Sequence, residues 1–148
     1  MFGRHFKQIK NFHFSVNKTF AKHSDVIIIG GGTGGIAMAK QLPNIGIKKE
    51  QITIFDPSQI HHYQPSWTII GGLAKQKGFL SKSSFQIKKL LGKDYNFQNT
   101  GIKELNPENN SLIDEKGEKW TYHQLIVSCG IKVKYDSIPG ILYFYIFF

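Results

Sequence analysis

Ten consecutive residues, VIIIGGGTGG at positions 26–35, decide the fold class of this 148-residue chain. The four β-branched residues favour a short strand buried on both faces, which is typical of parallel sheets. Gly30, Gly32 and Gly35 then match G-x-G-x-x-G, in which the first glycine turns the chain, the second lets the backbone approach a pyrophosphate and the third allows close helix packing. Residues 36–42 are predicted to form the following helix, whose N-terminal N–H groups would face the phosphates.

An acidic residue at the end of the next predicted strand strengthens this interpretation. Residues 51–55 (QITIF) form that strand, and Asp56 follows it, 21 residues after Gly35. A carboxylate at this place accepts hydrogen bonds from the ribose hydroxyls of an adenosine and repels a 2′-phosphate. The combination predicts an adenine dinucleotide site and leaves the choice between NAD and FAD open.

The later part of the chain changes its pattern. Residues 82–91 carry apolar side chains among lysines and indicate a short surface helix, whereas 102–105, 112–113 and 120–122 are short runs separated by turn residues, which indicates an antiparallel β-meander. The apolar run 125–127 indicates one further buried strand. The sequence therefore predicts an α/β, Rossmann-like FAD/NAD(P)-binding fold with a parallel sheet and a small antiparallel meander.

The excess of positive charge is concentrated at the N-terminus. The chain has 19 Lys+Arg and 10 Asp+Glu, a net charge of +9, and residues 1–24 contain five of the basic residues and no acidic one. A basic, acid-free segment with interleaved phenylalanines is typical of a mitochondrial presequence, with a disordered basic arm as the alternative. The rest of the chain has only scattered lysine pairs, so no nucleic-acid partner is expected.

Cysteine and histidine usage limits the chemistry that the chain offers. Cys129 is the single cysteine, which excludes a disulfide framework and a cysteine-based zinc site, and we expect it to be buried and inert behind the strand 125–127. His61 and His62 lack a third ligand at usable spacing, so no metal site is expected there. No apolar run reaches the roughly 18 to 20 residues that a membrane-spanning helix needs.

Several separated segments resemble known flavoproteins. Residues 121–130 (TYHQLIVSCG) look like the second signature of the flavoprotein reductases that have two dinucleotide-binding domains. HHYQPSWT at 61–68, AKQ at 74–76 and ELNP at 104–107 closely resemble the mitochondrial-type sulfide:quinone oxidoreductases of the FAD-dependent pyridine nucleotide-disulfide reductase-like superfamily. The resemblance extends from about residue 25 to 140 and concerns the N-terminal portion of that family only.

The resemblance implies FAD as the cofactor, sulfide and ubiquinone as the reaction partners, and a peripheral position at the inner mitochondrial membrane. Thr33 and Gly34 would lie at the pyrophosphate and Gln64 nearer the flavin, while the backbone N–H and C=O of Ile102 would meet the adenine edge. Motif and resemblance together predict the following cofactor-binding residues: Gly30, Gly32, Thr33, Gly34, Gly35, Asp56, Gln64 and Ile102.

The reaction implied by the resemblance is two-electron oxidation of sulfide by a pair of cysteines, with transfer through FAD to ubiquinone. Cys129 matches neither of those cysteines, so no catalytic residue is predicted and an enzymatic activity of this chain is uncertain. We expect a presequence at 1–24, an apparently truncated FAD-binding domain at 25–140 and an apolar tail unlike the family at 141–148, together an incomplete, inactive fragment. The alternatives are another flavoprotein of the superfamily, such as an NADH:quinone dehydrogenase, and a non-catalytic dinucleotide-binding remnant.

Overall fold

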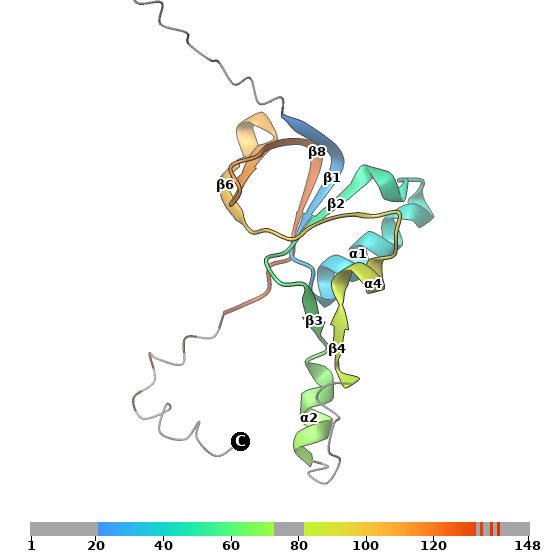
Figure 1. The fold of residues 1–148 in the computed structure, drawn as a ribbon, viewed down its shortest axis with the longest axis vertical. Helices are drawn as coiled ribbons and strands as arrows, with labels where there is room; N and C mark the ends of the chain where they lie inside the picture. The colour runs from blue at the N-terminus through green and yellow to red at the C-terminus, as the bar shows by residue number, and fades with distance from the viewer. Residues whose placement is uncertain (1–20, 73–81, 133, 135–136, 138, 140–148) are drawn as a thin grey trace, which may run out of the picture.

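A computed structural model describes residues 21–72, 82–132, 134, 137 and 139 of the chain (Figure 1). Most of the predicted presequence and the whole predicted apolar tail lie outside these residues, as does the segment 74–76. Within the described part, no helix is both long enough and apolar enough to cross a membrane.

One six-stranded sheet organises the molecule, with the strand order β5-β2-β1-β8-β7-β6. Its strands are β1 (Lys22–Ile29), β2 (Ile52–Phe55), β5 (Asn96–Gln98), β6 (Ile102–Asn106), β7 (Ser111–Asp114) and β8 (Lys119–Val127). β5, β2, β1 and β8 run parallel, whereas β7 is antiparallel to both of its neighbours, β8 and β6. The predicted combination of a parallel sheet with an antiparallel meander is confirmed.

The last strand differs from the prediction in one respect. The runs 120–122 and 125–127 were expected to be separate strands, but they form the single strand β8. The two polar residues between them, His123 and Gln124, include no turn former, and Gln124 pairs with Val26 of β1. β8 therefore pairs with β7 at its start and with β1 along most of its length, which joins the meander directly to the parallel strands.

The first helix begins earlier than predicted. α1 (Thr33–Gln41) starts three residues before the expected Ile36, so Gly34 and Gly35 belong to its first turn. The other short helical elements are η1 (Leu42–Ile45), η2 (Lys49–Gln51), α4 (Ile87–Leu91) and η3 (Pro107–Asn109).

A small arm extends beyond the carboxyl ends of the parallel strands (Figure 1). It consists of β3 (Ile60–His62) and β4 (Ser84–Gln86), which pair antiparallel, and of α2 (Pro65–Gly72). The surface helix predicted over 82–91 is wrong in extent: its middle residues form β4, and the helix that remains, α4, buries Ile87 and Leu91 while Lys88 and Lys89 are exposed. Pairing with β3, a contact distant in sequence, extends the backbone over 84–86.

The alternation of side chains along β1 divides the core into two clusters. Val26 and Ile28 face a cluster that also contains residues of α1 and α4, whereas Ile27 and Ile29 face a cluster with residues of the meander. On the meander side Trp120 packs edge-to-face against Phe55 of β2, with ring centroids 5.2 Å apart. Both faces of β2 and of the last four residues of β1 are thus covered, which explains why these stretches are apolar apart from Thr53.

Candidate dinucleotide site at the carboxyl ends of the parallel strands

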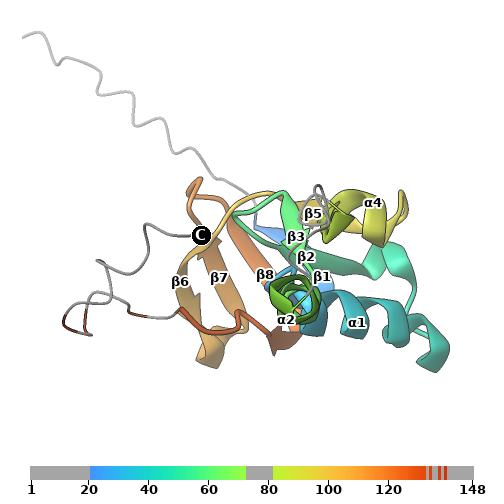
Figure 2. The same ribbon diagram turned by 90° about the horizontal axis from the view of Figure 1, so that it is seen from below.

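The candidate site lies where the parallel strands β1, β2 and β8 end (Figure 2). Gly30 follows β1, and its N–H donates to the Phe55 carbonyl at the end of β2 at 2.8 Å. Ser128 follows β8, and its N–H donates to the Ile29 carbonyl at 2.8 Å. The three strand ends are therefore held in one plane, at the edge where open α/β sheets bind ligands.

Two of the motif glycines are required by the packing of the protein itself. Gly30 has a φ of +107°, and a Cβ there would lie 2.4 Å from the Ser128 carbonyl oxygen. A Cβ on Gly35 would lie 1.9 Å from the carbonyl oxygen of Gly30, because α1 crosses the end of β1 at this point. These glycines let the chain turn and let the helix approach the strand, as predicted from their spacing.

At position 32, by contrast, no contact within the protein requires a glycine. A Cβ at this position would meet no atom within 4 Å, and the residue lines a cavity of about 630 Å³. A side chain there would project toward the cavity without disturbing the fold. The absence of one keeps the backbone open to a ligand, which is the function that the motif assigns to its second glycine.

The N-terminus of α1 opens into the same cavity. Thr33 and Gly34 line it, and Gly32 is the N-cap, so no side chain caps the helix. The first turn has no acidic residue. The unpaired N–H groups and the positive end of the helix dipole are consequently available to an anion.

Asp56 connects the end of β2 to the glycine loop. Its Oδ2 accepts a hydrogen bond from the Gly31 N–H at 2.6 Å, and its Oδ1 accepts one from the Ser58 N–H at 2.7 Å. Each carboxylate oxygen retains further acceptor capacity, so the residue can still receive ribose hydroxyls. The loop and the carboxylate are thereby held in a fixed relation before any ligand binds.

The cavity beside the glycine loop is completed by the arm and by the segment after β8; we call it the loop-side cavity. Its lining combines Gly30–Gly34 and Asp56 with residues of the arm and of the chain after β8, namely Ile60, His61, His62, Gln64, Pro65, Trp67 and Ser128–Ile131. Gln64 thus shares a cavity with the motif glycines although it is distant from them in sequence. Among the described residues, no lysine or arginine lines this cavity. A bound pyrophosphate would depend on backbone N–H groups.

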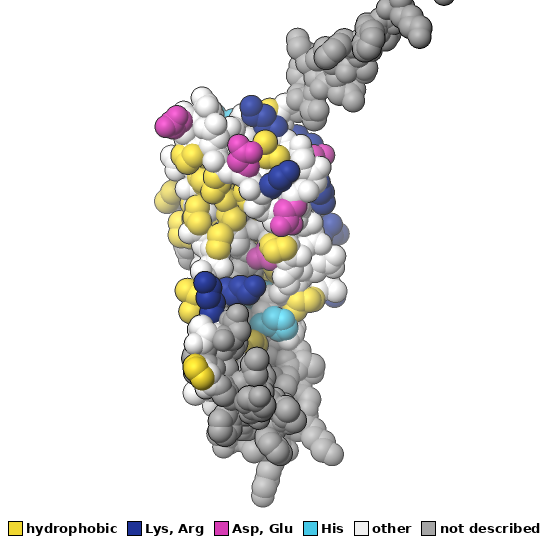
Figure 3. Space-filling model, turned by 90° about the vertical axis from the view of Figure 1, so that its left-hand side faces the viewer, with side chains coloured by type: hydrophobic (Ala, Val, Ile, Leu, Met, Phe, Trp, Pro, Cys, Tyr) yellow, Lys and Arg dark blue, Asp and Glu magenta, His cyan; other side chains and the backbone are white. Residues whose placement is uncertain are grey.

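A second cavity of about 510 Å³ lies between the strand ends and the meander; we call it the meander-side cavity. Ile102, which opens the edge strand β6, lines it together with Thr100, Gly101 and Lys103. Both cavities share Gly30, Asp56 and Cys129. Hydrophobic side chains gather on the side of the molecule that carries the meander (Figure 3). The two adjoining cavities provide one elongated site that suits an extended ligand.

Of the eight predicted residues, seven line one of the two cavities, and the eighth, Gly35, lies behind them in the contact between α1 and β1. The cavity-lining residues that stand at the sheet edge outside the predicted set include Thr100 and Gly101, and also Ser128–Gly130, the turn that the resemblance had placed in the second flavoprotein signature. Their signal was their place after β5 and β8, at the carboxyl edge of the sheet. β5 has the polar sequence Asn96-Phe97-Gln98 and was not recognised as a strand.

The expectation that Cys129 is buried is wrong. It is exposed and lines both cavities, and its Sγ lies 3.8 Å from the Ile29 carbonyl oxygen. The residue comes after the end of β8, where the chain leaves the core, so the burial of the strand does not extend to it.

The histidines of the arm differ in their surroundings. His61 is half-buried, and desolvation followed by the charge of His62 lowers its pKa from the usual 6.5, although Asp56 opposes this. His62 is exposed, lies 2.9 Å from the Ser84 hydroxyl through Nδ1 and has its ring centroid 6.0 Å from that of Trp67. His61 therefore faces the cavity as a neutral imidazole at neutral pH.

A comparison with known protein families identifies the family to which this glycine loop and sheet belong. A family profile described as pyridine nucleotide-disulphide oxidoreductase matches residues 24–148. The chain belongs to this family. The strand-loop-helix unit that β1, the glycine loop and α1 form here is of the kind that binds dinucleotides in Rossmann-like folds.

Individual relatives show which enzymes within this family the chain resembles. The chain is 32% identical over 123 residues to the mitochondrial sulfide:quinone oxidoreductase of Mus musculus, covering 83% of this chain and 26% of that protein. It is 32% identical over 118 residues to the enzyme of the same name from Dictyostelium discoideum, covering 78% and 25%. The solved sulfide:quinone oxidoreductase of the hyperthermophilic bacterium Aquifex aeolicus superimposes with a TM-score of 0.60 at 26% identity, over 76% of this chain and 25% of that one. The chain spans about a quarter of these relatives, and the resemblance to their N-terminal portion is confirmed.

The family implies a flavin-type cofactor, and the described residues fit one. A Cβ at Gly32 would meet no protein atom within 4 Å, the uncapped end of α1 can receive phosphates, and the Asp56 carboxylate lines the same cavity as a hydrogen-bond acceptor. The meander-side cavity continues from Asp56 toward Ile102, which leaves room for the adenine end.

Proposed function

We propose that this chain provides the FAD-binding N-terminal part of a mitochondrial sulfide:quinone oxidoreductase. The observation that carries the cofactor assignment is the open space at Gly32 in front of the uncapped helix α1. Sulfide and a quinone as partners, ubiquinone in a mitochondrion, are supported by the names of the similar enzymes and by the run 63–67 (YQPSW), of which Gln64, Pro65 and Trp67 line the loop-side cavity.

In this proposal the backbone N–H groups at Gly32, Thr33 and Gly34 bind the pyrophosphate. Asp56 orients the adenosine ribose, the backbone of Ile102 meets the adenine edge and Gln64 contacts the cofactor nearer the flavin. Gly30 and Gly35 act indirectly, since they set the path of the loop. When bound, the flavin supplies a two-electron redox centre between sulfide and the quinone.

The substitution Gly32→Ala tests the cofactor assignment. The added methyl group meets no protein atom, so we expect the melting temperature to change little, whereas FAD affinity should fall at least about tenfold as the methyl group occupies the path of the phosphates. Flavin fluorescence or equilibrium dialysis measures the binding. Asn44→Ala, an exposed change near the other end of α1, is the matched control. Unchanged FAD affinity in the Gly32→Ala protein would refute the assignment.

We expect these 148 residues by themselves to bind FAD weakly and to show no turnover. The resemblance implies chemistry by two cysteines, and the chain has Cys129 alone. Addition of sulfide to the purified chain loaded with FAD should leave the visible flavin absorption unchanged. Tight stoichiometric flavin that sulfide bleaches would contradict this expectation.

The proposed location is the mitochondrion, with the protein peripheral to the inner membrane where ubiquinone resides. The basic, acid-free residues 1–24 support it as a presequence. Import of the full chain into isolated mitochondria should be lost when Arg4, Lys7 and Lys10 are replaced by Glu. Import that continues in this variant would contradict the presequence.

A further inference from the structure

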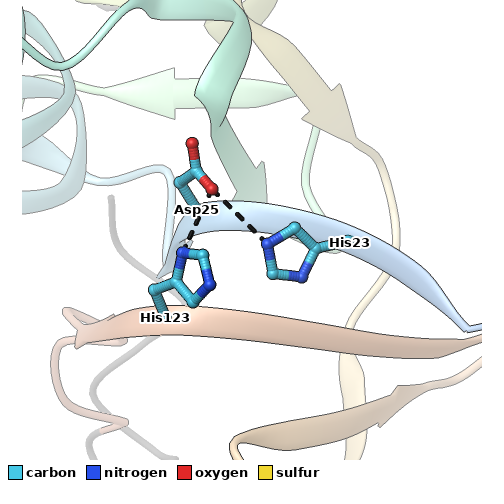
Figure 4. Close-up of side chains that lie close together, drawn as sticks. All are labelled: His23, Asp25 and His123. Atoms are coloured by element: carbon cyan, nitrogen blue, oxygen red, sulfur yellow. Dashed lines mark ion pairs between the residues drawn. The ribbon is translucent and has the colours of Figure 1, made fainter.

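Three side chains that commonly bind metals meet on β1 and β8, outside the dinucleotide site (Figure 4). His23 and Asp25 are two residues apart on β1 and share one face of the strand, and His123 comes from the adjacent strand β8. Asp25 precedes Gly30 by five residues, which corresponds to about 16 Å along an extended strand. The cluster therefore belongs to the opposite end of the sheet from the glycine loop.

Both imidazoles point toward one carboxylate oxygen. Nε2 of His23 lies 3.4 Å from Oδ1 of Asp25, and Nδ1 of His123 lies 3.2 Å from the same atom. The ligand atoms of the three residues all lie within 4.8 Å of one another. The ligand atoms around a tetrahedral zinc ion, at 2.0 to 2.1 Å from it, are about 3.3 to 3.4 Å apart. The two separations from Asp25 Oδ1, 3.4 and 3.2 Å, are already close to this value.

A neighbouring hydroxyl holds the ring of His23. Thr121 Oγ1 lies 2.9 Å from Nδ1 of His23, so Nδ1 is turned toward β8 and Nε2 toward Asp25. In the tautomer that carries its proton on Nδ1, the hydroxyl accepts that proton and Nε2 presents a lone pair to a metal ion.

The carboxylate is oriented in a similar way. The side-chain amide of Gln51 donates to Oδ2 of Asp25, which directs Oδ1 toward the two histidines. Thr121 and Gln51 are thus outer partners that fix the metal-binding atoms, as the second shell of a metal site does.

We propose that His23 Nε2, Asp25 Oδ1 and His123 Nδ1 bind a zinc-class divalent ion that links β1 to β8. Two imidazoles and one carboxylate suit Zn²⁺, whereas Mg²⁺ and Ca²⁺ require oxygen ligands almost exclusively. The His123 side chain is 71% exposed, so its ring can rotate to shorten the separation from His23, whose ring centroid is 4.7 Å away. Water would occupy the fourth position from the solvent side.

The test is titration of the full chain with zinc chloride in chelator-free buffer, by calorimetry and thermal unfolding. We expect one zinc ion per chain and a rise in melting temperature of roughly 5 °C at saturation, because the ion binds the folded sheet alone. Magnesium chloride should give neither effect. The single substitutions H23A and H123A, both at exposed positions, should abolish zinc binding, and Gln51→Ala should weaken it about tenfold.

A matched control uses the four histidines outside the cluster, among the six of the chain. The variant H5A/H13A/H61A/H62A keeps only His23 and His123 and should bind zinc as the unaltered chain does. Anomalous scattering at the zinc edge in a crystal of that variant should place the ion among the three side chains. The proposal is overturned if the folded chain, checked by circular dichroism, binds no zinc, or if zinc binding is lost in the four-histidine variant and persists in H123A.

Discussion

The parallel and antiparallel halves of the six-stranded sheet achieve stability in different ways, although β8 belongs to both. In the parallel half, β2 is buried along its whole length and the last four residues of β1 are buried as well. In the meander, the edge strand β6 is almost entirely exposed, and turn contacts supplement the buried side chains of β7 and β8. Asp114, fully buried, accepts hydrogen bonds from the N–H groups of Lys116 and Glu118 and from the Trp120 indole.

This difference explains how the two halves share the candidate site. The parallel strands use their side chains for the core, so at the carboxyl edge the glycine loop, Asp56 and the residues that follow β5 and β8 remain to meet a ligand. The meander is less constrained by packing and offers its edge strand, where Ile102 lines the second cavity. A dinucleotide that spans both cavities would depend on the junction between the halves.

Removal of the Trp120 side chain should have the largest effect, because this ring joins the halves. The indole is buried, contacts Phe55 of β2 and donates to Asp114 at 3.3 Å. We expect Trp120→Ala to lower the free energy of unfolding by about 3 to 5 kcal/mol, measured by urea denaturation. Ile45→Ala, at an exposed apolar position, should change it by no more than about 0.5 kcal/mol. Equal effects of the two substitutions would show that the ring does not join the halves.

The substitution Gly35→Ala should destabilise the parallel half of the sheet without acting directly on the meander. Its Cβ would lie 1.9 Å from a backbone oxygen that cannot move without displacing the end of β1. We expect a loss of about 3 kcal/mol in unfolding free energy, together with loss of FAD binding. Gly32→Ala is the contrasting variant, in which binding falls while stability is kept. Stability of the Gly35→Ala protein equal to that of the unaltered chain would contradict the close approach of α1 to β1.

The substitution Asp56→Asn acts at the junction of the two cavities. Both carboxylate oxygens accept backbone N–H groups, and an asparagine has one acceptor oxygen, so either Gly31 or Ser58 loses its partner. We expect FAD affinity to fall about 30-fold, or about 2 kcal/mol, in equilibrium dialysis. Asp94→Asn, which removes an exposed ion pair with Lys49, is the control and should bind FAD normally. An Asp56→Asn protein of unchanged affinity would exclude a role in ribose binding.

The smallest effect concerns His61 in the arm. Its pKa is lowered in the folded protein, so the unfolded chain binds a proton more readily. The stability that neutral His61 contributes is present above pH 6.5 and is lost as the pH falls below this value. NMR titration of the imidazole should give a midpoint below 6.5, and His62→Gln should move it upward because the charge of His62 is removed. A midpoint that does not move would show that His62 has no such influence.

The glycine loop and the buried strands were predictable because their requirements are local. A run of β-branched residues followed by spaced glycines can adopt few conformations in which the apolar side chains are buried and the chain turns at the glycines. The extent of β8, the polar strand β5 and the pairing of β3 with β4 were not predictable in this way. Their sequences are short or polar, and they are strands because a distant partner supplies the hydrogen bonds.

The sequence by itself determined the dinucleotide-binding unit: strand, glycine turn, helix and Asp56, whose positions follow from backbone sterics and from spacing along the chain. The tertiary structure decided what these residues meet. In the folded chain Cys129 is exposed, Gln64 lines the loop-side cavity and Ile102 lines the adjoining meander-side cavity. His123 lies beside His23 and Asp25. These contacts join residues far apart in the sequence, and only the pairing of strands across the sheet determines which of them become neighbours.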